Sequence, residues 1–273
     1  MTRVLPLAVV LALAPAARGQ LIAYDGFDYP IGGLRGQGGG MGFARPWDGY
    51  DTVQVQAASL TPPAPSASLA TTGNSVSAFE GVTFGAAART LSQPVDATPG
   101  TTFWLSAVVR GPAPNPNSAE GLLILQTSLG PNTGISVTTG TSPSSFWTLQ
   151  DPASGAMGVA SSAAPSSIQC LLVVRGTFAA VGDTYDLYVN PPLTGTPPPS
   201  PAASITASHA TAPLDQLALA HLALPSDTVS STLFDEVRIG HTFADVTPVP
   251  EPSARSLAGV AGAAVALARR RRR

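Results

Sequence analysis

The 273-residue sequence contains no lysine: all 14 of its basic residues are arginines. A phosphate-binding P-loop, a Schiff-base lysine and a Ser-x-x-Lys nucleophile each need an ammonium group at a fixed place, so the sequence excludes all three. Charged residues make up only 11% of the chain. No apolar run reaches the roughly 18 residues that indicate a membrane-spanning helix. The chain is therefore neither a highly charged disordered polymer nor a membrane bundle.

Cysteine and histidine are also scarce. Cys170 is the single thiol and can form no disulfide within the chain. The three histidines, His209, His221 and His241, are 12 and 20 residues apart, whereas zinc ligands cluster at spacings of about two to five residues. The sequence therefore predicts no zinc site, and the apolar neighbours of Cys170 indicate a buried side chain.

Glycine and proline are abundant, with 27 residues each, and this limits the helix content. The proline-rich segments 61–65, 111–117 and 191–199 are predicted loops, since proline lacks the backbone donor of a β-ladder. Residues 101–110 alternate in the manner of a strand that is apolar on both faces. Further strands are expected at 121–127, 168–175, 184–190 and 214–224, and from weaker patterns at 21–25, 52–57, 66–70, 76–79, 135–139, 146–150 and 233–239. Many short strands separated by turns predict an all-β, two-sheet jelly-roll sandwich that occupies residues 20–248 as one domain.

The first 19 residues have the order of a secretory signal peptide. A charged start at Arg3 is followed by an apolar run and then by Ala17 and Gly19, which suit the cleavage site. Cleavage after Ala16 or Ala17 also fits. Retention as an uncleaved anchor is the alternative, which the shortness of the apolar run disfavours. We therefore expect an exported protein.

The last 25 residues, 249–273, combine three features in a fixed order. Val249 and the motif Pro250, Glu251 and Pro252 are followed by an apolar stretch at 256–268, and the chain ends in a basic cluster. Thirteen helical residues rise only about 20 Å, so this membrane helix would be short. The arginines would hold the C-terminus on the cytoplasmic side. The cluster consists of Arg269, Arg270, Arg271, Arg272 and Arg273.

This arrangement resembles the PEP-CTERM sorting signal of Gram-negative bacteria. The resemblance implies that Pro250, Glu251 and Pro252 are recognised by an exosortase, with transient anchoring in the inner membrane. It also implies delivery to the cell surface or to an extracellular polysaccharide matrix. A basic tail for nucleic acid is the alternative. Because residues 20–248 carry six arginines against fifteen acidic residues, a net charge of about −9 disfavours nucleic acid as a partner.

Three segments of the body carry a second resemblance. Residues 24–30 with the glycine-rich stretch to Trp47, residues 171–191, and residues 234–240 resemble PEP-CTERM proteins with a laminin-G or concanavalin-A-like body. That resemblance supports the jelly-roll prediction but implies little about a ligand.

Several side chains are candidates for a ligand or metal site. Trp47, beside Pro46 and a turn, is the candidate for stacking on a sugar ring. Asp25, Asp28 and Asp235 are weak candidates for Ca²⁺, which prefers oxygen ligands from several loops. Aspartate is also an ordinary turn residue, so structural capping is the alternative. No other cofactor is expected.

No catalytic residues can be named. Asp235 and Glu236 are adjacent on a predicted strand, so we expect them on opposite faces, where they cannot form the facing pair that glycoside hydrolysis needs. The Glu-x-Asp-x-x-Glu pattern of concanavalin-like glucanases does not occur. The sequence therefore favours a non-enzymatic, exported structural or adhesive protein that exosortase sorts. The alternative is a lectin-like carbohydrate-binding module that uses Ca²⁺, and a polysaccharide hydrolase ranks last.

Overall fold

The computed structural model describes residues 20–78, 84–112, 120–128, 134–139, 146–161, 163, 165, 167–207, 212–222 and 231–248. The predicted signal peptide (1–19) and sorting signal (249–273, with Pro250, Glu251, Pro252 and Arg269 to Arg273) lie outside these residues. Within the described part of the chain, no helix combines the length and apolar character needed to cross a bilayer.

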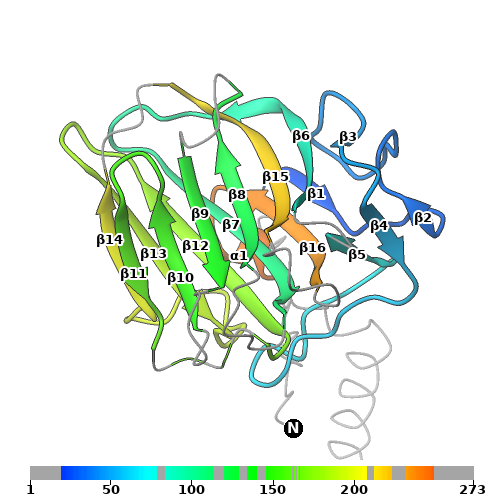
Figure 1. The fold of residues 1–273 in the computed structure, drawn as a ribbon. Helices are drawn as coiled ribbons and strands as arrows, with labels where there is room; N and C mark the ends of the chain where they lie inside the picture. Colours follow the sequence, from blue (N-terminus) through cyan, green and yellow to red (C-terminus); the bar gives the residue numbers. More distant parts are fainter. Residues whose placement is uncertain are drawn as a thin grey trace, which may run out of the picture.

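Two antiparallel sheets face each other in a sandwich (Figure 1). The first has seven strands in the order β11 (Ala156–Val159), β10 (Trp147–Asp151), β9 (Gly134–Thr139), β8 (Glu120–Gln126), β15 (Leu214–Leu222), β6 (Phe84–Val95) and β3 (Asp48–Gly49). The second has nine: β14 (Ala203–Ala207), β13 (Asp183–Val189), β12 (Cys170–Thr177), β7 (Thr102–Arg110), β16 (Thr232–Gly240), β5 (Ser75–Ala78), β4 (Val53–Gln56) and β2 (Gly32–Gly33), with β1 (Leu21–Asp25) paired to β16. The predicted two-sheet jelly roll is confirmed.

The main core lies between the sheets and follows the two-residue period of the strands. In β7 the inward side chains include Phe103 and Leu105, which pack with Leu217 and Leu219 of β15 and Trp147 of β10. Burying these apolar side chains stabilises the sandwich by roughly 1.5–3 kcal/mol each before chain entropy is subtracted.

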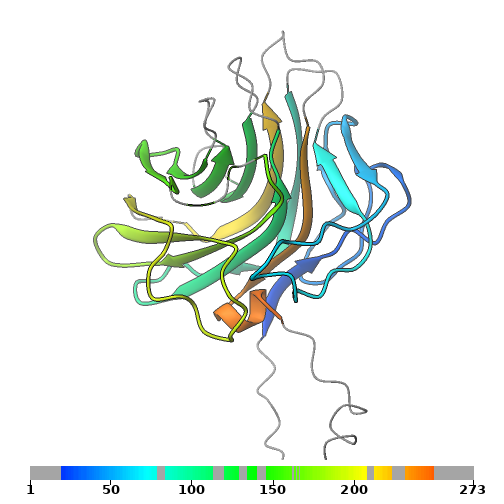
Figure 2. The same cartoon turned by 90° about the horizontal axis from the view of Figure 1, so that it is seen from below.

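A smaller second core covers the outer face of the nine-stranded sheet. Trp104 and Val108 of β7 point away from the main core and pack against Phe243 of α1 (Phe243–Val246) and against Tyr188. Thr242 begins this short helix with a capping box, and Figure 2 shows the helix against the outer side of the sheet. This second core explains why both faces of β7 are apolar.

The predicted strand positions agree with the structure at most sites. Residues 21–25 form a strand with the expected bounds, and 101–110 begins one residue later, at Thr102. The strand predicted at 66–70 is wrong, because these residues form turns. Ser66 is buried there and its hydroxyl donates to the carbonyl of Pro191. The sequence does not predict the two-residue strands β2 and β3 or the strands β6, β11 and β14. Strand β6 contains three consecutive alanines, Ala86 to Ala88, and alanine has a low intrinsic preference for strands.

Candidate ligand-binding site

Trp47, the sequence candidate for sugar stacking, lies in the interior. Its side chain is 1% exposed, its Nε1 donates to Oδ2 of Asp25 at 2.9 Å, and its ring centroid is 5.9 Å from that of Phe27. An enclosed indole cannot offer a face to a sugar, so this prediction is wrong. The physical reason is that the buried carboxylate of Asp25 requires N–H and O–H donors around it.

Asp25 is the centre of a buried polar network. Its Oδ2 also accepts from the Tyr29 hydroxyl at 2.6 Å and from Nη1 of Arg89 at 2.7 Å. The Arg89 guanidinium lies over the Phe43 ring at 4.2 Å, and its Nε donates to the carbonyl of Arg45 at 2.7 Å. Burial and the charge of Asp25 raise the pKa of Tyr29. The network therefore joins β1, β6 and the loop before β3.

The three calcium candidates do not assemble a cation site. Both oxygens of Asp25 accept hydrogen bonds from protein donors, while Asp28 is exposed. Asp235 is fully buried and accepts from Ser59 and the Leu60 amide. In the described ranges, His, Cys, Asp and Glu side chains nowhere gather in a group of three that could hold a metal ion. These residues therefore do not fit a bound Ca²⁺.

A β-bulge changes the predicted orientation of Asp235 and Glu236. The pairing of β16 with β7 shifts between Asp235 and Arg238, and Glu236 has a positive φ of 53°. Both carboxylates therefore lie on the outer face of the nine-stranded sheet, where they contact the loop 57–74 between β4 and β5. The prediction that they lie on opposite faces is wrong. Asp235 accepts from Ser59 and Leu60, whereas Glu236 accepts from the Thr72 amide and from Arg238.

Asp235 and Glu236 lie in different electrostatic environments. Burial, with a smaller contribution from the charge of Glu236, raises the pKa of Asp235 to about 7. Glu236 forms an ion pair with Arg238, whose guanidinium also lies 4.8 Å from the centroid of the Tyr24 ring. Both side chains have no exposed area and are held by protein donors. They act as structural groups and do not reach solvent as a catalytic pair.

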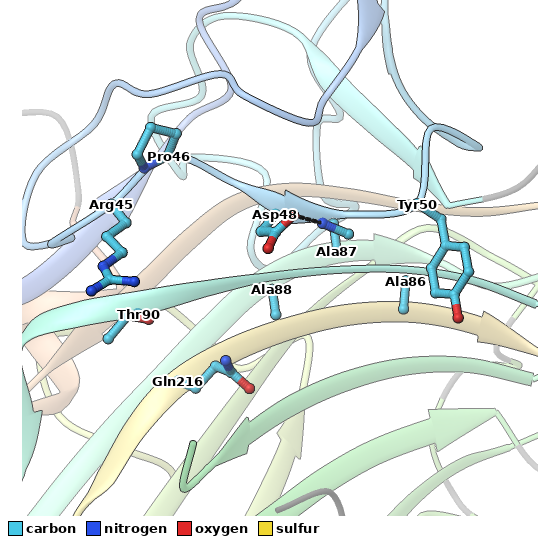
Figure 3. A pocket seen from close by; sticks show the side chains of 10 residues that line it. Arg45, Pro46, Asp48, Tyr50, Ala86, Ala87, Ala88, Thr90 and Gln216 are labelled. Atoms are coloured by element: carbon cyan, nitrogen blue, oxygen red, sulfur yellow. Dashed lines mark hydrogen bonds between the residues drawn. The ribbon is translucent and has the colours of Figure 1, made fainter. Parts of the chain in front are cut away.

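The described residues contain a depression of about 520 Å³ on the outer face of the seven-stranded sheet. It lies over β6 and β15, at the edge where β3 pairs with β6 (Figure 3). Figure 3 shows Arg45 and Tyr50 at its two ends, with the methyl groups of Ala86 and Ala88 between them. Gln216 contributes an amide group from β15.

The local sequence explains why this surface is open. The outward side chains of β6 at this surface are Ala86, Ala88 and Thr90, and the two alanines leave room above the sheet. Gly49 pairs with Ala87 at a φ of 145°, and a Cβ atom there would lie 2.2 Å from the carbonyl oxygen of Ala86. Only glycine allows this close approach. The approach places Tyr50 at the rim with 54% of its surface exposed.

The depression offers one aromatic face, one cation and several neutral hydrogen-bonding groups. Arg45 is exposed and forms no ion pair with a described carboxylate. The Oε1 of Gln216 accepts from Gln126 at 2.7 Å, which orients the amide toward the site. Asp48 is the single carboxylate among the described lining residues, and it accepts from the Gly49 amide and lies 3.5 Å from Nε of Arg35. This set of groups suits a polyhydroxyl ligand, for which the Tyr50 ring would be the aromatic platform.

Sequence reasoning missed Arg45, Tyr50 and Gln216. A usable signal was present, since Tyr50 follows Trp47 by three residues and stands directly after Gly49 in the same turn. Which of two nearby aromatic residues faces solvent depends on the Asp25 network, and the sequence alone does not disclose that network.

No family model matches this chain, and no curated protein sequence is significantly similar to it. Among solved structures, an endo-1,3-β-glucanase from Streptomyces sioyaensis is similar with a TM-score of 0.51 at 9% identity, over 84% of this chain and 98% of that chain. The carbohydrate recognition domain of Emp47p gives a TM-score of 0.43 at 9% identity, covering 84% and 99%. The exoplasmic/lumenal domain of VIP36, in a Ca²⁺/Man-bound form, gives 0.40 at 11% identity, covering 72% and 83%. At such identities, the likeness to the glucanase shows a shared fold alone.

Proposed function

We propose that this chain is an exported carbohydrate-binding protein with an adhesive or structural role in the cell envelope or extracellular matrix. The observation that carries the proposal is the open depression with the exposed Tyr50 ring at one end and Arg45 at the other. Sugars bind through ring stacking together with hydrogen bonds from a few placed polar groups. The flat alanine surface between the two ends leaves space for a saccharide chain.

The role proposed is binding without hydrolysis. Glycoside hydrolysis needs two carboxyl groups about 5 Å or about 6.5–9.5 Å apart, one of them with a raised pKa. Among the described residues that line the depression, Asp48 supplies one carboxylate. The buried pair Asp235 and Glu236 lies on the other sheet and has no exposed surface. Binding therefore fits this surface better than catalysis does.

The two ends of the chain support export. Residues 1–19 have signal-peptide order, and residues 249–273 resemble a PEP-CTERM signal, for which an exosortase and the inner membrane are the proposed partners. Deleting 249–273 should release the protein from the membrane fraction into the medium or periplasm. Unchanged membrane fractionation would contradict this part of the proposal.

The binding proposal is tested by affinity electrophoresis through gels that contain neutral glucans or acidic polysaccharides. We expect retardation in at least one gel. Tyr50→Ala should weaken binding about tenfold, because the ligand loses its contact with the exposed part of the aromatic side chain, about half of it. Val181→Ala, at a position 91% exposed on the β12–β13 turn, is the matched control and should migrate as the wild type does. Equal retardation of the wild type and Tyr50→Ala would refute the site.

A further inference from the structure

Two arginines of residues 20–248 differ from the other four in having no described carboxylate partner. Four of the six arginines in residues 20–248 face carboxylates: Arg35, Arg89, Arg175 and Arg238. Arg45 and Arg110 have no carboxylate partner among the described residues, and both are exposed. The body carries about nine net negative charges, so an arginine that faces none of the described carboxylates stands out on it. Each of the two lines a depression.

Arg110 lines a second depression of about 300 Å³. The outward side chains of four adjacent strands meet there, on the outer face of the nine-stranded sheet. Arg110 of β7 is paired in register with Leu233 of β16, and Leu233 is paired with Ser77 of β5. Gln56 of β4 closes the far side. Since the inward residues of these strands form the main core, this depression and the Arg45 depression lie on opposite faces of the sandwich.

The lining of the second depression suits an anion. An arginine presents a planar fork of N–H donors that matches carboxylate or sulfate oxygens. Ser75 and Ser231 add hydroxyl groups, and no carboxylate lies among the described lining residues. Asp235 has no exposed surface, and its carboxyl group accepts hydrogen bonds from two of the lining residues, from the Ser59 hydroxyl and from the Leu60 amide.

We propose that the Arg110 depression is a second ligand site, which binds a carboxylate or sulfate group of an acidic polysaccharide. The proposal rests on the proposed carbohydrate-binding function and adds the class of ligand, because Arg45 gives the first site the same preference. Two sites on opposite faces let one molecule hold two polysaccharide chains. The protein would then act as a cross-link in an acidic matrix, with the local contacts of Arg45 and Arg110 outweighing the general repulsion between the polymer and a body of net charge about −9.

Isothermal titration calorimetry with short probes tests the second site directly. The probes are a uronate trisaccharide, a sulfated trisaccharide of equal length and a neutral glucan trisaccharide. We expect two acidic-probe sites per wild-type molecule and one in Arg45→Gln or Arg110→Gln, with affinity at the altered site reduced about 10- to 100-fold. Arg110→Lys keeps the charge and should restore part of the affinity. Whichever of the two acidic probes binds identifies the anionic group.

The outcomes separate this proposal from the function proposed above. Unchanged stoichiometry in Arg110→Gln, with binding lost in Tyr50→Ala, would overturn the second site and leave the first. Loss of acidic-probe binding in Arg110→Gln, with no effect of Tyr50→Ala, would overturn the first site and the bridging but retain the second. Binding of the neutral probe alone would overturn the anionic assignment. Bridging itself predicts that the wild type, but neither single arginine variant, makes solutions of the acidic polymer turbid.

Discussion

Removing the carboxylate of Asp25 should destabilise the whole sandwich. Asp25 is 1% exposed and accepts from four donors: the Phe27 amide, the Tyr29 hydroxyl, the Trp47 indole and Arg89. In Asp25→Ala these donors lose their acceptor, and the 5%-exposed guanidinium of Arg89 loses its counter-charge.

The size of this effect follows from the burial of the pair. Removing one partner of a buried ion pair costs about 3–5 kcal/mol, because the other charge is left uncompensated. The three other donors share the same network, so their separate costs do not simply add. For a domain of this size, about 2–4 °C per kcal/mol implies that Tm falls by roughly 6–20 °C.

Thermal and urea unfolding, followed by circular dichroism at pH 7, measure this change. Asp28→Ala is the matched control, since Asp28 is exposed three residues away and should change stability by no more than about 0.5 kcal/mol. The double variant Asp25→Leu with Arg89→Met should recover part of the loss, because it removes both charges. A loss below about 1 kcal/mol in Asp25→Ala would refute the role given to this network.

Two further variants test the bulge and the turn beside the depression. The pKa of Asp235 is about 7 in the folded protein against 3.8 ordinarily, so its contribution to stability is fully present below about pH 3.8 and is lost as pH rises through about 7. The full difference is on the order of 4 kcal/mol. Asp235→Asn should therefore flatten the decline in unfolding free energy between pH 4 and pH 8, and a curve parallel to that of the wild type would contradict this. Gly49→Ala should lower Tm and weaken polysaccharide binding, since its Cβ would lie 2.2 Å from the Ala86 carbonyl oxygen; wild-type values in both assays would show that the turn tolerates a side chain.

The sequence was informative where a strand is strongly patterned. The segment 101–110 was recognisable because its alternating positions are apolar on both faces, and the structure shows a different core on each side of β7. Strand β6 was missed because its alanines carry little strand preference, although it is the longest of the described strands and forms the surface of the depression.

The candidate site was harder to predict because it depends on long-range contacts. The sequence indicates Trp47 as the exposed aromatic residue, yet its buried indole donates to Asp25, 22 residues earlier in the chain. Strand alternation predicts that Asp235 and Glu236 lie on opposite faces of the sheet, but the bulge at Glu236 places both on the same face. Neither the Trp47–Asp25 hydrogen bond nor the bulge has a local signal in the sequence.

Hydroxyl-radical footprinting of Tyr50 tests the proposed function most directly. The wild type is labelled with and without a saturating polysaccharide that retards it in affinity gels, and oxidation is measured by mass spectrometry. The account predicts that Tyr50, 54% exposed, becomes severalfold less reactive in the complex, while Met157, 61% exposed on the far edge strand β11, reacts at an unchanged rate. Equal oxidation of Tyr50 in the free and the bound protein would contradict it.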